Sequence, residues 1–138
     1  MESGGLRLRV LICDDTESIR RLLRILLELE GHTVRETEDA LGLLEHLRDQ
    51  VEDLPDLILL DAHMAPRDGW WAIGEIRADR RFEGVPVILV TAAIHGLDPG
   101  LIDEAGFDAW LGKPFDPDDL LDLVSRTAAG RRAPSPPS

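Results

Sequence analysis

The sequence lacks several features that would place it in common classes of protein. Its single cysteine, Cys13, cannot form an internal disulfide, and its apolar neighbours favour a small core residue in a reducing compartment. The longest apolar stretch, near residues 85–94, is too short to span a bilayer, and the N-terminus has no apolar signal-peptide segment. We therefore expect a cytoplasmic protein with no membrane partner.

Basic residues are also scarce. The 138 residues include 27 Asp and Glu against 15 Lys and Arg, which gives a formal net charge of −12 and a pI near 4.6. A charge of this sign argues against general binding to nucleic acid, so we expect no nucleic-acid partner. Only one of the 15 basic residues is a lysine, Lys113. Its ammonium is a compact point charge that suits a single phosphoryl oxygen, whereas a planar guanidinium suits paired contacts.

The length and the hydrophobic content fit one domain. A chain of 138 residues with 43% hydrophobic residues can bury one ordinary core. We expect this domain to span residues 6–128, after a flexible N-terminus at residues 1–5. Residues 129–138 are rich in Pro and Ser, and we expect them to form a disordered tail.

Short apolar runs alternate with segments of helical period. The apolar runs predict strands at residues 6–13, 33–37, 56–60, 85–90 and 107–111. The periodic segments predict helices at residues 16–30, 39–49, 70–79, 98–105 and 116–128. Because parallel strands need crossover connections, which helices supply, the pattern predicts a doubly wound α/β fold. It would have a five-stranded parallel sheet with helices on both faces.

Polar residues follow or close four of the predicted strands. Asp14 and Asp15 follow the first, Asp61 the third, Thr91 the fourth and Lys113 the fifth. Doubly wound sheets bind ligands at the carboxyl ends of their strands, so we expect these five side chains at one edge. Taken singly, each has a simpler explanation, such as helix capping by the acidic pair or a turn at Asp61. Their occurrence together favours a functional site.

These residues resemble the receiver domain of two-component response regulators over roughly residues 8–128. The matching segments are Asp14-Asp15, Asp61 with Met64 and Asp68-Gly69, Thr91-Ala92, and Ala105-Gly106 leading through Trp110 to Lys113-Pro114-Phe115. The resemblance implies a flavodoxin-like fold with strand order 2-1-3-4-5. It also implies that Asp61 accepts a phosphoryl group from a histidine kinase or a histidine phosphotransfer protein.

The resemblance implies a role for each residue at this sheet edge. Mg²⁺ would be held by Asp14, Asp15, Asp61 and the backbone carbonyl of His63, and the phosphoryl oxygens would be contacted by Thr91 and Lys113. Oxygen ligands are those that Mg²⁺ prefers. Phosphoryl transfer needs positioning and charge neutralisation, which a metal ion, a lysine and a hydroxyl supply. The Asp61 carboxylate would be the nucleophile.

The sequence departs from the family pattern close to the acceptor. In the family a proline often follows the methionine directly, but here Ala65 separates Met64 from Pro66, so the loop after Asp61 is expected to take a different path. The family's switch and tuning positions correspond to Thr91, Trp110, His63 and Ala93. A tryptophan is bulkier than the usual Tyr or Phe. A cis peptide bond before Pro114 is also implied by the resemblance.

The expected function is that of a stand-alone phosphoacceptor that signals by changing a protein–protein surface. In the family that surface is built from the fourth helix, fifth strand and fifth helix, here residues 98–105, 107–111 and 116–125. A downstream protein or a second copy would bind there. We expect no enzymatic activity beyond phosphotransfer and autodephosphorylation. The alternatives are a receiver-like adaptor that works without phosphorylation, a phosphorelay intermediate, or a phosphatase that uses an aspartyl phosphate and His63.

Overall fold

The computed structural model describes residues 7–92 and 96–132. The strands are β1 (Arg9–Cys13), β2 (Thr33–Thr37), β3 (Leu57–Asp61), β4 (Val87–Thr91) and β5 (Ala109–Gly112). The helices are α1 (Glu17–Leu29), α2 (Ala40–Asp49), α3 (Gly69–Ala78), α4 (Pro99–Ala105) and α5 (Pro117–Arg132). All five strands are parallel and form one sheet in the order β2-β1-β3-β4-β5, as predicted.

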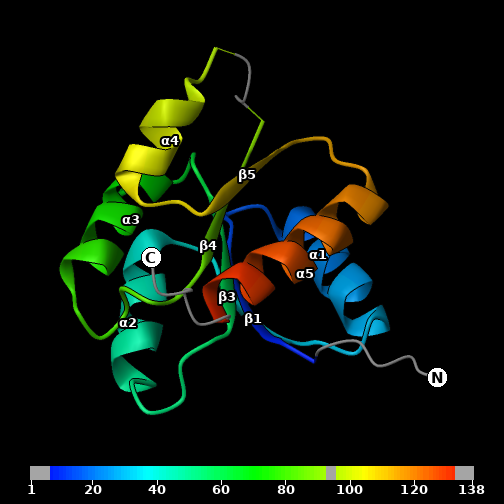
Figure 1. Ribbon diagram of the computed structural model, residues 1–138, viewed down its shortest axis with the longest axis horizontal. Helices are drawn as coiled ribbons and strands as arrows, with labels where there is room; N and C mark the ends of the chain where they lie inside the picture. Colours follow the sequence, from blue (N-terminus) through cyan, green and yellow to red (C-terminus); the bar gives the residue numbers. More distant parts are fainter. Residues whose placement is uncertain (1–6, 93–95, 133–138) are drawn as a thin grey trace, which may run out of the picture.

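The sheet is covered on both faces (Figure 1). Side chains of α1 and α5 pack on one face, and side chains of α2, α3 and α4 pack on the other. Alternation along β1 serves both layers, because Leu11 faces α2 and α3 while Val10 and Ile12 face α1 and α5. Every residue of β3 and β4 is buried, which explains why these strands appear in the sequence as continuous apolar runs.

Aspartate side chains precede four of the helices and cap them. Asp39, Asp68, Asp98 and Asp116 each accept a hydrogen bond from a backbone N–H in the first turn of α2, α3, α4 and α5, respectively. Helix α1 differs, because its first residue is preceded by Thr16, whose side chain makes no such bond. The acidic pair before α1 therefore does not act as an ordinary helix cap at that position.

The end of the last helix lies beyond its expected position. Helix α5 runs to Arg132, so the domain boundary predicted after residue 128 falls inside it, together with the first residues of the predicted tail. Alanine and arginine have high helix propensity, and one glycine costs only about 1 kcal/mol, so residues 129–132 can continue the helix. Residues 1–6 and 133–138 lie outside the described residues, and they include the whole of the predicted flexible N-terminus, residues 1–5, and the rest of the predicted tail.

Two proline peptides within the described residues are cis. The bond between Lys113 and Pro114 has the cis form that the resemblance implied, and so does the bond between Ala65 and Pro66, which was not foreseen. Within residues 7–92 and 96–132, no helix combines the length and apolar character needed to cross a membrane.

Candidate functional site

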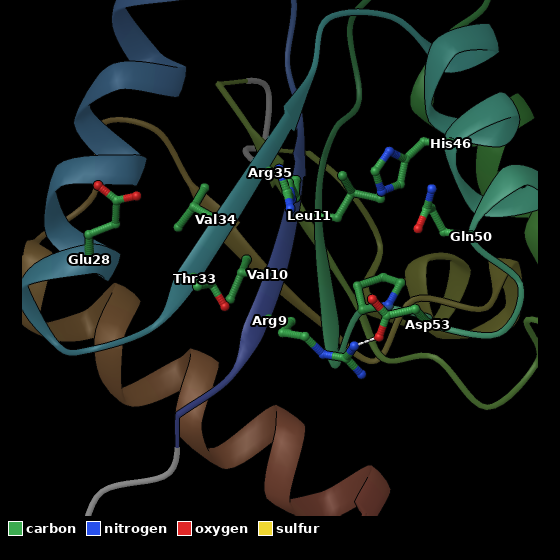
Figure 2. A pocket seen from close by; sticks show the side chains of 11 residues that line it. Arg9, Val10, Leu11, Glu28, Thr33, Val34, Arg35, His46, Gln50 and Asp53 are labelled. Carbon is green, nitrogen blue, oxygen red and sulfur yellow. Dashed lines mark ion pairs between the residues drawn. The ribbon is translucent and has the colours of Figure 1, made fainter.

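A pocket of about 630 Å³ lies beside β1 and β2 (Figure 2). Residues of both charges line it, among them Arg9, Arg35, Glu28 and Asp53, and Arg9 forms an ion pair with Asp53. None of the residues predicted to form the functional site lines this pocket. The balance of opposite charges does not favour any one class of ligand.

The register of the parallel sheet brings the predicted residues together at its carboxyl edge. Cys13, directly before Asp14, pairs with Leu60, directly before Asp61. Thr91 pairs with Gly112, and the next residue, Lys113, donates its backbone N–H to the carbonyl of Thr91 at 2.9 Å. The strand ends thus place the acidic pair on one side of Asp61 and Lys113 on the other.

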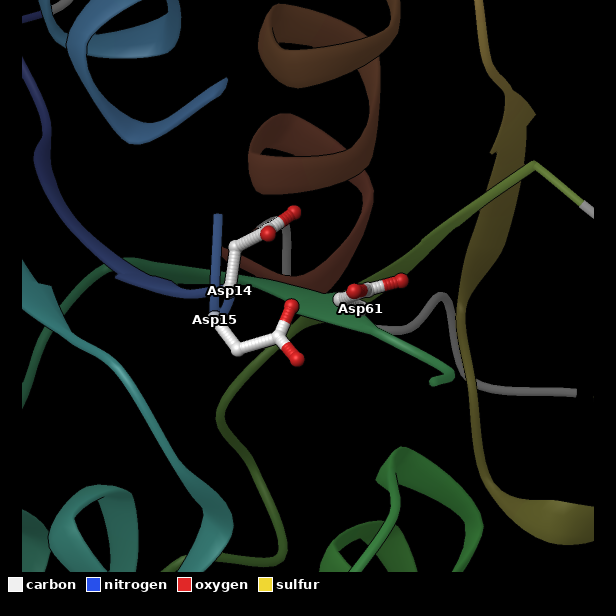
Figure 3. A group of neighbouring side chains, drawn as sticks. All are labelled: Asp14, Asp15 and Asp61. Carbon is white, nitrogen blue, oxygen red and sulfur yellow. The ribbon is translucent and has the colours of Figure 1, made fainter. Parts of the chain in front are cut away.

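Three carboxylates form a cluster at this edge (Figure 3). Asp14, Asp15 and Asp61 each offer an oxygen, and these oxygens all lie within 4.8 Å of one another. Asp14 and Asp61 are only 2% and 5% exposed, while Asp15 is exposed to solvent. A set of carboxylate oxygens that is open to water on one side fits Mg²⁺, which usually combines one or two carboxylates with water and phosphate ligands.

Lys113 supplies positive charge inside this cluster. Its Nζ lies 2.7 Å from Oδ2 of Asp14 and 3.7 Å from Oδ1 of Asp61. The other carboxylate oxygen of Asp14 accepts the backbone N–H of Thr16 at 2.9 Å. Oδ1 of Asp61 accepts the backbone N–H of His63 at 3.3 Å. One ammonium therefore offsets two buried carboxylates, which leaves the cluster with an excess of negative charge.

The pKa of Asp61 is raised above its ordinary value. Burial is the largest cause, and the negative charge of Asp14 acts in the same direction. Lys113 and the backbone N–H of His63 favour the ionised form and oppose this shift only in part. The ionised Asp61 carboxylate is thus held at a free-energy cost in the metal-free fold.

We predict that Asp61→Asn raises the stability of the metal-free protein at pH 7. Since the folded pKa exceeds the unfolded one, the ionised carboxylate destabilises the fold above that pKa. The advantage of Asp61→Asn should shrink as the pH falls through the raised pKa and vanish below 3.8, the ordinary value. Thermal melts in EDTA between pH 3 and 8 measure this, with exposed Asp103→Asn as the control. Wild type more stable than Asp61→Asn at pH 7 would contradict the prediction.

Helix α3 approaches the end of β3 very closely. The N–H of Gly69 donates to the carbonyl of Ala62 at 2.9 Å. A Cβ at position 69 would lie 2.3 Å from the carbonyl oxygen of Asp61, which is far inside van der Waals contact. The Asp68-Gly69 motif therefore combines a helix cap with the absence of a side chain.

The remaining predicted positions differ in their exposure. Thr91 is fully buried, whereas His63 is exposed, and Trp110 is 44% exposed on β5. Ala93, the fourth tuning position, lies outside the described residues. The roles of these residues in switching and tuning stay predictions.

The sequence did not identify one residue that lies near the site. Arg20, in the first turns of α1, donates from Nη1 to the backbone carbonyl of Asp14 at 2.8 Å. Its helical position one and a half turns after the acidic pair is the only sequence signal that could have indicated it. Three arginines occur close together in this helix, so sequence alone does not single out Arg20.

This chain is similar to known proteins in sequence and in fold. A family model for the response regulator receiver domain matches residues 10–125. An uncharacterized 14.6 kDa protein in the sodA1 3′ region of Leptolyngbya boryana is 36% identical over 85% of this chain and 87% of its own length. RpaA of Synechocystis, a DNA-binding dual master transcriptional regulator, is 34% identical over 84% of this chain but 47% of its own length. The chain thus spans about half the length of that regulator, and the absence of a nucleic-acid partner stays a prediction.

One similar solved structure contains a bound metal ion. The receiver domain of the sensor histidine kinase PA1611 from Pseudomonas aeruginosa PAO1 is 26% identical and has a TM-score of 0.77. The match covers 90% of this chain and 99% of that domain, whose active-site cleft coordinates a magnesium ion.

Proposed function

The chain belongs to the response regulator receiver domain family, and we propose that Asp61 accepts a phosphoryl group from a histidine kinase or a histidine phosphotransfer protein. One observation carries the proposal: Lys113 and two further carboxylates surround a buried Asp61 at the carboxyl edge of the sheet. An adaptor that worked without phosphorylation would gain nothing from three crowded carboxylates, which raise the free energy of the fold.

In the proposed reaction, a carboxylate oxygen of Asp61 attacks the phosphorus of a phosphohistidine. An oxygen–phosphorus bond forms, the phosphorus–nitrogen bond breaks, and the bonding electron pair leaves with the imidazole nitrogen. Lys113 and the hydroxyl of Thr91 would contact the phosphoryl oxygens and hold the transferred group. Mg²⁺, held by Asp14, Asp15 and Asp61 with the carbonyl of His63, would neutralise charge on those oxygens when bound.

The proposal predicts covalent modification at one residue. Treatment with acetyl phosphate or phosphoramidate and Mg²⁺ should add a single phosphoryl group to the wild-type protein, as measured by intact-mass spectrometry. Asp61→Asn should abolish the added mass because it removes the nucleophilic oxygen, and Asp103→Asn, on the exposed face of α4, should retain it. Modification that persists in Asp61→Asn would refute the assignment. No modification of wild type would favour the adaptor.

We propose that phosphorylation of Asp61 changes the face built from α4, β5 and α5, and that a downstream protein binds this face. Both helices contact β5, and this face exposes two large apolar side chains, Leu101 at 58% and Trp110 at 44%. The exposed acidic residues on the same elements include Asp103, Glu104 and Asp119. Exposed apolar and acidic side chains on these elements fit a downstream protein with a basic binding surface better than a second copy of this acidic chain.

His63 is proposed to tune the lifetime of the phosphorylated state. Hydrolysis needs a water in line with the bond between Asp61 and phosphorus, and the exposed His63 side chain lies two residues along the same loop. We expect His63→Ala to change the dephosphorylation rate by about twofold or more. Mass spectrometry can follow the loss of phosphate from both proteins. His63→Ala would lose phosphate more slowly than wild type if the imidazole orients water, and faster if the imidazole blocks water. Equal rates would show that His63 has no such role.

A further inference from the structure

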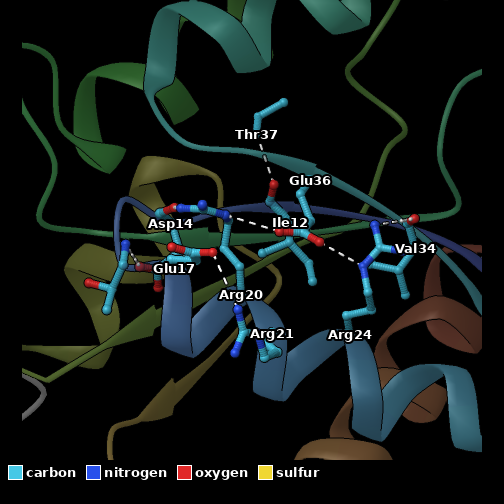
Figure 4. A network of polar contacts seen from close by, with 10 residues as sticks. Ile12, Asp14, Glu17, Arg20, Arg21, Arg24, Val34, Glu36 and Thr37 are labelled. Atoms are coloured by element: carbon cyan, nitrogen blue, oxygen red, sulfur yellow. Dashed lines mark hydrogen bonds and ion pairs between the residues drawn. The ribbon is translucent and has the colours of Figure 1, made fainter.

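A guanidinium from α1 binds the main chain of the acidic pair (Figure 4). Arg20 donates from Nη1 to the carbonyl oxygen of Asp14 at 2.8 Å and from Nε to Oε1 of Glu36 at 3.0 Å. The Arg20 side chain is only 13% exposed. Because Glu36 belongs to β2, one side chain connects α1, the segment after β1 and the edge strand of the sheet.

The carbonyl that Arg20 binds belongs to the peptide group between Asp14 and Asp15. The Asp14 carboxylate is held independently, by the backbone N–H of Thr16 at 2.9 Å and by Lys113 at 2.7 Å. Asp15 is exposed, and its carboxylate accepts only a 3.3 Å bond from the hydroxyl of the neighbouring Thr16 among the hydrogen bonds found in the described residues. The direction of the Asp15 side chain therefore depends mainly on the orientation of this peptide group.

Glu36 is itself held in place. It accepts a second hydrogen bond from Nε of Arg24 at 2.6 Å, and Arg24 also binds Glu28 at 3.1 Å and the carbonyl of Val34 at 3.2 Å. Burial acts to raise the pKa of Glu36, but the hydrogen bonds from Arg24 and Arg20 outweigh it and lower the pKa. Glu36 is thus ionised at neutral pH and forms a charged, fixed partner for Arg20.

We propose that Arg20 is a positioning residue for the divalent-cation site. By binding the carbonyl of Asp14 while paired with Glu36, it holds the peptide group so that the Asp15 carboxylate stays beside those of Asp14 and Asp61. This inference rests on the proposed function, because it requires the three carboxylates to bind Mg²⁺.

Electrostatics alone makes the opposite prediction. Arg20 carries a positive charge near the site, so its removal would strengthen Mg²⁺ binding if charge were its only influence. If Arg20 positions Asp15, its removal weakens binding, by about tenfold as for other outer partners of metal ligands. The sign of the change therefore separates the two effects.

Arg21 offers a matched control on the same helix. Its side chain is 70% exposed and pairs with Glu17 at 3.4 Å, and it makes no contact with the acidic pair among the described hydrogen bonds and ion pairs. Arg21→Gln removes the same charge as Arg20→Gln. It should leave the Mg²⁺ dissociation constant unchanged or slightly lower.

Calorimetric titration of the full chain with MgCl₂ tests the inference, with urea denaturation in EDTA as a check on folding. We expect Arg20→Gln to raise the Mg²⁺ dissociation constant by about tenfold and Glu36→Gln to raise it by less, because the latter keeps the bond to Asp14. Arg20→Lys keeps the charge but loses the planar guanidinium that donates to two partners. Its Mg²⁺ dissociation constant should lie between those of wild type and Arg20→Gln.

A dissociation constant for Arg20→Gln equal to that of Arg21→Gln, or lower, would overturn the positioning role. If Arg20→Gln does not fold, the Mg²⁺ dissociation constants of Arg20→Lys and Glu36→Gln test the inference instead. Values equal to wild type in both variants would overturn the positioning role of Arg20. Wild type that binds no Mg²⁺ would refute the proposed function itself, and the inference with it. A stability loss with unchanged Mg²⁺ affinity would show that Arg20 is only structural.

Discussion

Replacing Lys113 with methionine should slow phosphorylation of Asp61 by about 10²- to 10³-fold, the usual cost of removing one group that stabilises charge in a transition state. The Lys113 ammonium lies 3.7 Å from a carboxylate oxygen of Asp61, within reach of a phosphoryl group attached there. Methionine has a similar shape but no charge. The rate of mass gain with phosphoramidate at saturating Mg²⁺ measures the effect, and a rate equal to wild type would contradict the assigned role.

The same substitution should destabilise the metal-free protein, by on the order of 3 kcal/mol. Lys113 forms ion pairs with both Asp14 and Asp61, and its loss leaves two buried carboxylates without that compensating charge. Mg²⁺, if bound at the proposed site, would stabilise the fold by mass action and should reduce this loss of stability. Urea denaturation with EDTA or with Mg²⁺ measures both values.

Lys113→Arg provides the control for charge. Arginine restores the positive charge, but its planar fork does not match a site built for a single ammonium. We therefore expect Lys113→Arg to recover more of the stability than of the phosphorylation rate. Equal recovery of both would show that charge alone explains the role of Lys113.

Gly69→Ala should lower the free energy of unfolding by about 1–3 kcal/mol, because it forces a methyl group into a filled space. The added Cβ would lie 2.3 Å from the carbonyl oxygen of Asp61 and 3.0 Å from Cα of Ala62. Both are backbone atoms, so relief requires α3 or the end of β3 to move. Since that movement displaces Asp61, phosphorylation should slow as well.

Gly74 lies in the same helix and gives the matched control. A Cβ at position 74 would meet no atom within 4 Å, and a glycine inside a helix is less favourable than alanine. Gly74→Ala should therefore raise the free energy of unfolding by about 0.5–1 kcal/mol. Urea midpoints of the two variants should shift in opposite directions. Shifts of the same sign would show that α3 does not approach Asp61 as closely as described.

The sequence by itself determined the alternation of strands and helices and the edge at which the site lies. Buried strands of a parallel sheet need continuous apolar runs, and helices on such a sheet need one apolar face, so both are local patterns. Because the carboxyl ends of parallel strands meet at one edge, Asp14, Asp15, Asp61, Thr91 and Lys113 could be grouped before any contact was known. The strand order came from the family resemblance, since pairing between strands depends on contacts that no local pattern encodes.

Tertiary structure alone decided how the grouped residues interact. The pairing of Lys113 with Asp14, the close approach of Gly69 to Asp61 and the bond from Arg20 to the acidic pair all join different elements of the fold. Each depends on small differences in the spacing between backbones, which are set by how the helices pack on the sheet. Residue type and spacing identify which groups can meet, but packing selects which atoms do.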